Sequence, residues 1–260
     1  MIGWLIAVFL LLAIGAIGYP IYQSAKPPQG SVAQFLKRSR PAGKRVAVVF
    51  GASTIHGRVG IDALPAVRDR LPGWEIVNGG HNGDTCLKLL ARVEPVLACK
   101  PDAIVVQAGG NDALGDRSTA DFEGDLTALV ERLQASGANL GLCSFQVAGD
   151  DLATRLNRLL GDYAQIVRGL AARRKLGYLP LRERMTADLE AHPGGRAWDR
   201  NFSIMLSSMF ERHLLRRSVD EQSRRRGFRF NADGLHLNTR GSGLLSDVIV
   251  EYLETVDRTS

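Results

Sequence analysis

Short apolar runs alternate with longer stretches of helical character from residue 45 to the end of the chain. The runs are rich in Val, Ile, Leu and Ala and lie at 46–50, 75–78, 103–108, 139–145 and 178–181. The stretches between and after them favour helices near 62–71, 86–98, 119–136, 151–175 and 240–257. Such alternation with short connections predicts a parallel sheet that is covered by helices on both faces. We therefore expect an α/β protein with a three-layer α/β/α sandwich and a flavodoxin-like strand order.

Small and polar residues follow three of these runs, at the point where each strand is expected to end. They form the segments Gly51-Ala52-Ser53-Thr54, Asn78 to Thr85 and Gly109-Gly110-Asn111-Asp112. A fourth segment, Asp233-Gly234-Leu235-His236, lies just before the last predicted helix. Because parallel strands bring their carboxyl ends to one edge of the sheet, we expect the first three segments to lie close together. Ligands bind at this edge in open α/β sheets.

The residue types in these four segments are those that a serine hydrolase requires. A serine hydroxyl becomes a nucleophile when a base accepts its proton, and the developing oxyanion needs hydrogen-bond donors. Ser53 is the candidate nucleophile, His236 the candidate base and Asp233 the candidate residue that orients the imidazole. The backbone N–H groups of Ser53 and Gly83 and the side-chain amide of Asn111 are candidates for the oxyanion hole.

Each segment has a simpler interpretation when it is taken alone. Gly-Ala-Ser is usually an ordinary turn, Asp-Gly is a common bend, and an isolated histidine is more often structural than catalytic. We expect His56 and His81 only to line the pocket, because neither has an acid at a convincing spacing. Asp84 and Asp112 are expected to cap or brace loops. The presence of all four segments in one chain nevertheless favours a common site.

Together the four segments resemble the sequence blocks of the SGNH (GDSL-like) hydrolase family. The resemblance extends over about residues 46–250 and is greatest to the branch of bacterial thioesterase/lysophospholipases and arylesterases. It implies a flavodoxin-like sheet, no metal and no other cofactor. It also implies the same site residues, namely Ser53 as nucleophile, Gly83 and Asn111 as oxyanion donors, and His236 with Asp233 as base and orienting acid.

Two features depart from the family pattern. Ala52 stands where the family usually has Asp, and an arginine-rich insertion at about 192–229 precedes the last segment. Since Ala52 has none of the assigned roles, we expect a serine hydrolase that cleaves a carboxylic ester or thioester through an acyl-enzyme, with lipid or acyl substrates favoured. One alternative is an O-deacetylase that acts on a carbohydrate or cell-envelope glycan. Another is a catalytically idle SGNH-like domain that acts as a membrane-associated binding module.

The N-terminal part of the chain differs in character from the rest. Residues 2–19 contain no charged side chain, and this run is long enough to cross a bilayer as a helix. A cleaved signal peptide is the alternative, although no positive side chain precedes the run. We expect a single-pass membrane anchor at 1–22, a basic tether at 23–44 and the hydrolase domain at 45–260. Because basic residues follow the run, the positive-inside tendency favours the cytoplasmic face for the domain.

The insertion is predicted to contain an amphipathic helix. Its apolar face is expected to include Met205, Met209 and Phe210, and its cationic flank Arg212, Arg216 and Arg217. Such a helix would overhang the pocket and steer acyl chains or anionic lipids toward Ser53, with lipid contact at 195–229. The alternatives are a helix that packs in the core and a charged face that is only solvated. A nucleic-acid partner is not expected, because aromatic residues do not interleave with the arginines. The three cysteines show no metal spacing, so we expect buried free thiols at Cys86, Cys99 and Cys143.

Overall fold

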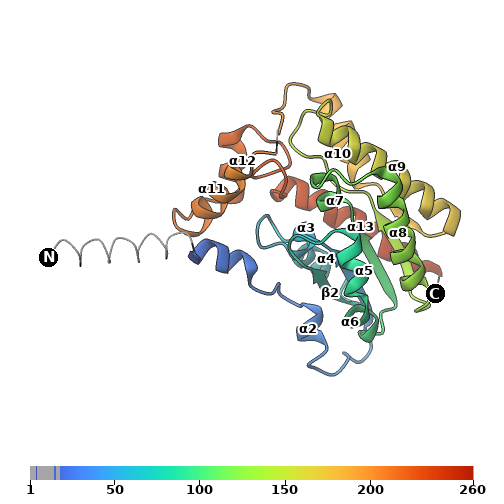
Figure 1. Ribbon diagram of the computed structural model, residues 1–260. Helices are drawn as coiled ribbons and strands as arrows, with labels where there is room; N and C mark the ends of the chain where they lie inside the picture. Colours follow the sequence, from blue (N-terminus) through green and yellow to red (C-terminus); the bar gives the residue numbers. More distant parts are fainter. Residues whose placement is uncertain (1–3, 5–14, 16–17, 199, 260) are drawn as a thin grey trace.

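The computed structural model describes residues 4, 15, 18–198 and 200–259, and a parallel sheet forms its centre (Figure 1). In this part of the chain the sheet has five strands in the order β2-β1-β3-β4-β5, and every neighbouring pair is parallel. The strands are β1 (Arg45–Gly51), β2 (Trp74–Gly80), β3 (Ala103–Gln107), β4 (Asn139–Cys143) and β5 (Gly177–Leu179). The flavodoxin-like order that the apolar runs predict is confirmed.

Helices cover both faces of the sheet. Since successive strand side chains point to opposite faces, Val46 and Val48 pack on one side of the sheet and Ala47 and Val49 on the other. The first side is covered by α5 (Cys86–Ala91), α6 (Val93–Ala98), α8 (Thr119–Gln134) and α9 (Arg155–Arg174). The second side is covered by α4 (Leu64–Arg70), α10 (Leu181–Ala191) and α13 (Thr239–Thr259). The three-layer arrangement is therefore confirmed, although the sequence pattern did not predict α10.

Serine and threonine side chains cap the N-termini of several helices. Each accepts a hydrogen bond from the backbone N–H three residues further on, as found at Thr85, Ser118, Thr154 and Ser218. A cap of this kind stabilises a helix by typically about 1 kcal/mol. The single helix predicted near 86–98 is wrong, because the chain divides it into α5 and α6 at Arg92, whose backbone leaves the helical region (φ −117°, ψ 27°).

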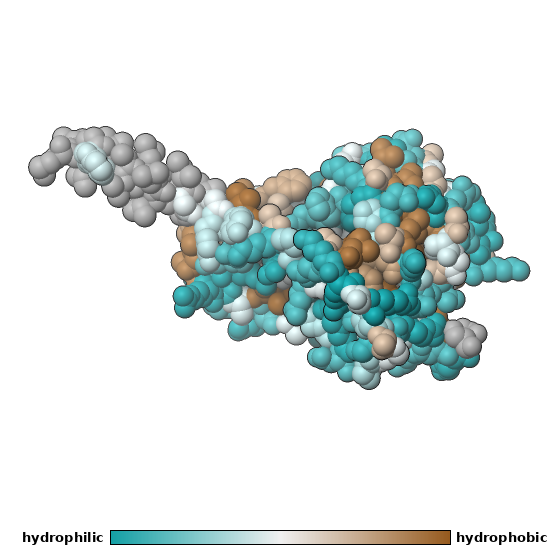
Figure 2. Space-filling model, turned by 90° about the horizontal axis from the view of Figure 1, so that it is seen from below, coloured by the Kyte–Doolittle hydropathy of each residue, from teal (hydrophilic) through white to brown (hydrophobic). Residues whose placement is uncertain are grey.

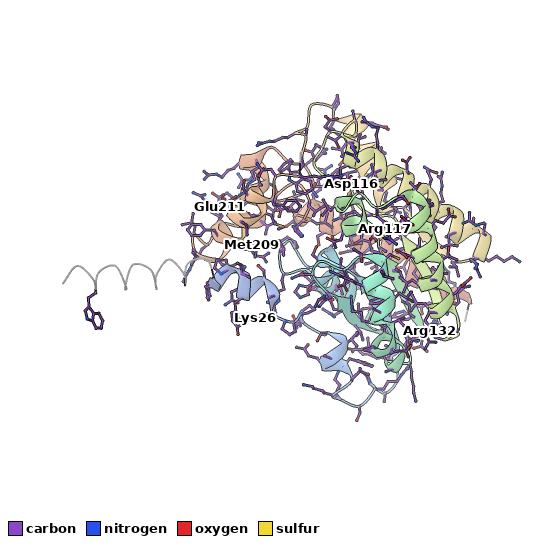
Figure 3. The ribbon with its side chains drawn as sticks, in the orientation of Figure 1. Lys26, Asp116, Arg117, Arg132, Met209 and Glu211 are labelled. Atoms are coloured by element: carbon purple, nitrogen blue, oxygen red, sulfur yellow. The ribbon has the colours of Figure 1, made fainter. Side chains whose placement is uncertain are left out.

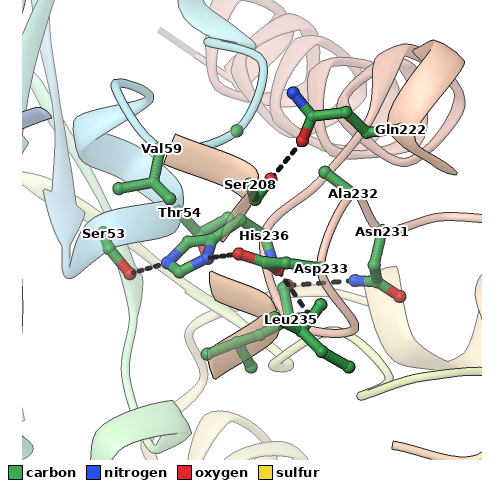
Figure 4. A network of polar contacts seen from close by, with 12 residues as sticks. Ser53, Thr54, Val59, Ser208, Gln222, Asn231, Ala232, Asp233, Leu235 and His236 are labelled. Carbon is green, nitrogen blue, oxygen red and sulfur yellow. Dashed lines mark hydrogen bonds and ion pairs between the residues drawn. The ribbon is translucent and has the colours of Figure 1, made fainter. Parts of the chain in front are cut away.

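The insertion at about 192–229 forms two further helices, α11 (Phe202–His213) and α12 (Val219–Arg226). They pack against one another, and the buried hydroxyl of Ser208 in α11 donates a hydrogen bond to the side-chain oxygen of Gln222 in α12 (Figure 4). In Figure 1 the two helices lie beside the sheet, next to the blue helical segment at residues 18–25. The insertion is therefore a small helical unit placed where the N-terminal segment meets the domain.

The membrane anchor predicted at 1–22 falls largely outside the described residues. Residues 18–25 are helical, and within the part of the chain that the structure describes no helix combines the length and apolarity needed to cross a membrane.

Much of the segment predicted as a tether, 23–44, packs on the domain. Ser31 and Gln34 form a capping box at α2 (Val32–Phe35), and Phe35 is buried in the core. The backbone N–H of Asn78, in the edge strand β2, donates to the carbonyl oxygen of Gly30 at 2.8 Å. These contacts fix the segment along one edge of the sheet.

Candidate active site

Ser53 is the first residue of α3 (Ser53–His56), and a single residue, Ala52, separates it from the end of β1. The first N–H groups of a helix have no intrahelical acceptor, so both the hydroxyl and the backbone N–H of Ser53 are available at the edge of the sheet. Gly51 permits the close approach of β3 and of the Ile55 side chain, since a Cβ there would lie 2.8 Å from the carbonyl oxygen of Gln107 and 2.6 Å from Ile55 Cγ1. Ala52 occupies the N-cap position and makes no side-chain cap, so the Asp usual in the family has no replacement here.

The structure brings Ser53, His236 and Asp233 into one hydrogen-bonded chain (Figure 4). His236 Nε2 lies 3.0 Å from Ser53 Oγ, and His236 Nδ1 lies 2.8 Å from Asp233 Oδ2. The other carboxylate oxygen of Asp233 accepts the backbone N–H groups of Leu235 and His236 at 3.0 and 2.8 Å. Asp233 and His236 are 1% and 3% exposed, so water does not compete for these bonds.

The environment of Asp233 favours its charged form. Burial alone would raise the pKa of this carboxyl, but the charge of His236 and the hydrogen bonds from His236 and Leu235 outweigh burial and lower the pKa. An ionised Asp233 accepts the Nδ1–H of the imidazole, which leaves the lone pair on Nε2 facing Ser53. This is the tautomer that can take a proton from a serine hydroxyl.

Gly83 and Asn111 border the same cavity as Ser53 and His236. Gly83 has a positive φ of 77°, and nothing lies within 4 Å of the place where a Cβ would be. Asn111 belongs to α7 (Gly110–Leu114), and one of its side-chain N–H groups donates to the carbonyl oxygen of Asp84 at 2.8 Å. Its second N–H therefore remains for a ligand. The structure thus places all five predicted site residues together.

A buried amide network that the sequence did not predict lies behind the proposed nucleophile. Gln146, just beyond β4, donates through Nε2 to Thr54 Oγ1 at 2.7 Å and to the carbonyl oxygen of Leu235 at 3.2 Å. Its own oxygen accepts from Gln107 Nε2 at 3.2 Å. Gln146 therefore links α3 to the loop that carries His236. The only indication in the sequence was a glutamine placed shortly after an apolar run.

Arg92 is a second residue that the sequence analysis missed. Its guanidinium donates to the carbonyl oxygens of Gly51 and Gly79, at 3.0 and 2.9 Å, and forms an ion pair with Asp84. It also lies over the ring of Phe50, with 4.6 Å between the guanidinium carbon and the ring centroid. Arg92 thereby joins the ends of β1 and β2 to the loop that carries Gly83.

The remaining polar residues brace the loops. Asp84 also accepts from His81 Nδ1 at 3.0 Å, so the expectation that His81 lacks a suitably spaced acid was wrong. Both carboxylate oxygens of Asp112 lie 3.1 Å from the backbone nitrogen of Cys86, the first residue of α5. Neither His56, which is buried, nor His81 borders the cavity that contains Ser53, contrary to expectation. The three cysteines are buried free thiols, as predicted.

An apolar cavity of about 270 Å³ opens beside Ser53. Phe202, Met205 and Met209 of α11 border it, so this helix overhangs the site as predicted. The prediction for its other side chains was wrong in part. Phe210 is 42% exposed, and Arg212 turns inward instead of forming a cationic flank.

Two arginines fix α11 across the site. Arg212 donates to the carbonyl oxygens of Arg58, Val59 and Gly60 at 3.0, 2.9 and 2.7 Å. Before the other end of the helix, Arg200 pairs with both oxygens of Asp116, at 2.7 and 2.8 Å. These contacts join α11 to the loop after α3 and to the turn after α7. Much of the insertion's positive charge is therefore structural.

Comparison with known proteins identifies the family. Residues 49–244, which contain all five site residues, match the model of the GDSL-like lipase/acylhydrolase family. The chain belongs to this family. It is 26% identical over 139 residues to an esterase, TesA, of Pseudomonas aeruginosa. The aligned residues make up 53% of this chain and 67% of that protein. The family membership and this relative make the chain an ester-cleaving hydrolase.

Solved structures show the same fold. The acetyl xylan esterase AlAXEase has a TM-score of 0.60 at 20% identity, covering 79% of this chain and 98% of its own. A lipase/acylhydrolase from Enterococcus faecalis has a TM-score of 0.57 at 22% identity, covering 82% and 96%. At these identities the likeness establishes the α/β architecture but not the substrate.

Proposed function

We propose that the chain hydrolyses carboxylic esters of apolar acyl groups through an acyl-enzyme formed on Ser53. The observation that carries this proposal is the chain of contacts from Ser53 Oγ through His236 to Asp233, at the border of an apolar cavity. The family membership supports the reaction class, and the methionine and phenylalanine side chains of α11 support an acyl group as the bound part of the substrate.

The geometry suggests how the reaction proceeds. His236 Nε2 accepts the hydroxyl proton as Ser53 Oγ attacks the ester carbonyl, and Asp233 stabilises the imidazolium that forms. The oxyanion accepts hydrogen bonds from the N–H groups of Ser53 and Gly83 and from the Asn111 amide. The intermediate then collapses, and the alcohol leaves with the proton from His236. A water molecule, deprotonated by His236, attacks the acyl-enzyme and releases the acid and Ser53. A thioester would react by the same steps with a thiol as leaving group.

A second candidate is removal of an acetyl group from a carbohydrate. Several similar structures are acetyl xylan esterases, and a cavity of about 270 Å³ is small for a ligand site. The apolar lining contributed by Met205 and Met209 favours the longer acyl group, because an acetyl group would leave most of this surface unused. A catalytically idle binding module is the least favoured alternative, since it would not require the aligned contacts of His236.

Two measurements test the proposal. A fluorophosphonate probe should label the wild-type protein at Ser53 and fail to label Ser53→Ala, and a series of p-nitrophenyl esters from acetyl to palmitoyl should be cleaved fastest at an intermediate acyl length. Labelling of Ser53→Ala, or a label located on another residue by mass spectrometry, would exclude Ser53 as the nucleophile. A monotonic preference for acetate would favour the deacetylase.

We also propose that the uncharged run within residues 1–22 anchors the hydrolase to a membrane, with the domain on the cytoplasmic face. The uncharged run at 2–19 and the basic residues that follow it support this arrangement. The protein should then remain in the membrane fraction after high-salt and carbonate washes. A mature N-terminus near Tyr19 would indicate a cleaved signal peptide instead, and a reporter fused to the C-terminus would locate the domain.

A further inference from the structure

The cavity beside Ser53 has two walls that do not belong to the sheet. One is α11, and the other is the helical segment 18–25, which contributes Ile21, Ser24 and Ala25. In Figure 3, Met209 of α11 is labelled just above the blue segment that bears Lys26. The match to the family model begins at residue 49, so this second wall lies outside the matched part of the chain.

Several contacts hold the helical segment 18–25 and the residues after it against the site. Asn82, which precedes Gly83 in the loop after β2, donates through Nδ2 to the carbonyl oxygen of Ser24 at 2.9 Å. Arg58 donates to the carbonyl oxygen of Pro27 at 3.0 Å. The ring of Tyr19 meets the imidazole of His213, at the end of α11, edge to face with 6.5 Å between centroids. The segment thus contacts both the proposed oxyanion loop and the helix that overhangs the cavity.

Two buried polar atoms at this wall have no hydrogen-bond partner among the described residues. They are the hydroxyl oxygen of Ser24, a residue that is 3% exposed, and the side-chain oxygen of Asn82. Both residues border the cavity that contains Ser53. A buried polar group without a partner destabilises the protein by about 1–3 kcal/mol, so a ligand that supplies partners here gains binding free energy. The pair is therefore a polar position in the pocket, in addition to Ser53, Asn111 and His236.

The chemistry of these atoms defines the group that fits. The bond from Asn82 Nδ2 to Ser24 leaves Asn82 Oδ1 as the free end of the amide, and an amide oxygen only accepts hydrogen bonds. The ligand must then donate to Asn82. A hydroxyl group does so and can also accept from the Ser24 hydroxyl, whereas an ester oxygen or a phosphate oxygen without a proton can only accept.

We propose that Ser24 and Asn82 bind a hydroxyl group on the alcohol part of the substrate, while Ile21 and Ala25 contact its acyl chain. The preferred substrate is then an ester that joins an apolar acyl chain to a hydroxyl-bearing alcohol, such as a monoacyl ester of a polyol. This inference rests on the proposed function of Ser53. It makes the helical segment 18–25 a determinant of specificity for the reaction.

The test compares two esters of one acid with the full-length protein. Monodecanoyl glycerol carries free hydroxyl groups, and methyl decanoate carries none. Ser24→Ala should lower the ratio of the two kcat/KM values, glycerol ester over methyl ester, roughly three- to tenfold, the scale of one neutral hydrogen bond. Ser24→Thr, which keeps the hydroxyl, should retain most of the ratio. Ser207→Ala is the matched control, because Ser207 Oγ donates to the carbonyl oxygen of Ile204 on α11 and does not border the cavity.

The acyl wall is tested by a second substitution. Ile21→Ser should lower kcat/KM for p-nitrophenyl decanoate relative to p-nitrophenyl acetate roughly fivefold, because apolar contact area is lost only for the longer chain. Tyr22→Ser is the control, since Tyr22 is 63% exposed on the same segment and does not border the cavity.

The outcomes separate this inference from the proposed function. The inference would be overturned if Ser24→Ala left the ratio of the two kcat/KM values unchanged, whether both values stayed the same or both fell equally. A purely structural role would not distinguish the alcohols. The inference would also be wrong if the wild type cleaved p-nitrophenyl acetate but neither decanoyl ester. In the cases that concern Ser24→Ala, the proposed function stands if Ser53→Ala abolishes hydrolysis. Cleavage of p-nitrophenyl acetate alone would favour the deacetylase instead. Retained hydrolysis in Ser53→Ala would overturn both.

Discussion

The indole of Trp198 packs directly against Gly234, so that a Cβ on Gly234 would lie 2.4 Å from the indole ring. Gly234 has a φ of 93° and lies between Asp233 and His236, whereas Trp198 is a buried residue of the insertion. The insertion therefore supports the loop that carries the proposed base, in addition to overhanging the cavity. Figure 2, which views the molecule from below, shows brown apolar atoms beside the N-terminal segment with teal polar atoms around them.

Gly234→Ala should disturb this loop and lower activity. The substitution combines a strained positive φ with a clash against Trp198, and together these should lower the free energy of unfolding by about 2–4 kcal/mol and kcat by more than tenfold. Urea denaturation and ester hydrolysis measure the two effects. Gly227→Ala separates the causes, because Gly227 has a φ of 73° but nothing within 4 Å of its Cβ position. Equal losses in both variants would show that Trp198 does not matter.

Arg92→Leu should lower both stability and activity. The change removes two hydrogen bonds to the carbonyl oxygens of Gly51 and Gly79 and leaves the buried Asp84 without its guanidinium partner. Since Arg92 is itself partly exposed, we expect a loss of about 2–3 kcal/mol, with a fall in kcat as the loop of Gly83 moves.

Arg132→Leu provides the comparison for Arg92. Arg132, labelled in Figure 3, pairs with Glu94 on the surface, and both side chains are substantially exposed. Its loss should therefore change the free energy of unfolding by less than about 1 kcal/mol and leave kcat unaltered. Similar effects of the two substitutions would contradict the structural role assigned to Arg92.

The contrast between Arg92 and Ser53 shows what the sequence could predict. The strand order and the positions of Ser53, Gly83 and Asn111 follow from local patterns, because parallel strands bring the turns after them to one edge. Arg92 and Gln146 act through contacts with residues far along the chain, which no local pattern records. The helical segment 18–25 was predicted as anchor and tether from its composition alone. Its place at the cavity depends on the loop of Asn82, nearly sixty residues later in the chain.

Acid should destabilise the protein through His56. Burial, with the charges of Arg58 and His81 adding to it, lowers the pKa of His56 from 6.5 to about 4. Between these values the unfolded chain binds a proton that the folded protein does not, so stability is full above pH 6.5 and falls as the pH drops. The expected loss from this group is about 2 kcal/mol between pH 7.5 and pH 5.

The contribution of His56 can be isolated by substitution. Urea denaturation of the wild type and of His56→Gln at pH 7.5 and pH 5 gives the pH dependence of each, and groups other than His56 cancel in the difference. The wild type should lose about 2 kcal/mol more than the variant over this interval. Parallel pH profiles would mean that the buried imidazole titrates as it does in the unfolded chain.

Asp233→Asn should reduce kcat by on the order of a thousandfold or more while leaving the fold intact. Oδ1 of Asp233 accepts two backbone N–H groups, so an asparagine there must keep its carbonyl oxygen at that position and direct its NH2 group at His236 Nδ1. Nδ1 would then become the acceptor and Nε2 would carry the proton. In that tautomer His236 cannot accept a proton from Ser53, although its position is unchanged.

The prediction for Asp233→Asn is checked by kinetics and by thermal unfolding. Loss of the carboxylate should lower kcat for p-nitrophenyl esters, while the midpoint of unfolding should shift by only a few degrees, because every hydrogen bond of Asp233 retains a partner. Asn231→Asp is a suitable control. Asn231 is also buried and donates to the carbonyl oxygen of Leu235 in the same loop, but it does not touch the imidazole. Its substitution should affect stability more than Asp233→Asn does and kcat less. A loss of kcat below tenfold in Asp233→Asn would show that His236 does not depend on Asp233 for its tautomer.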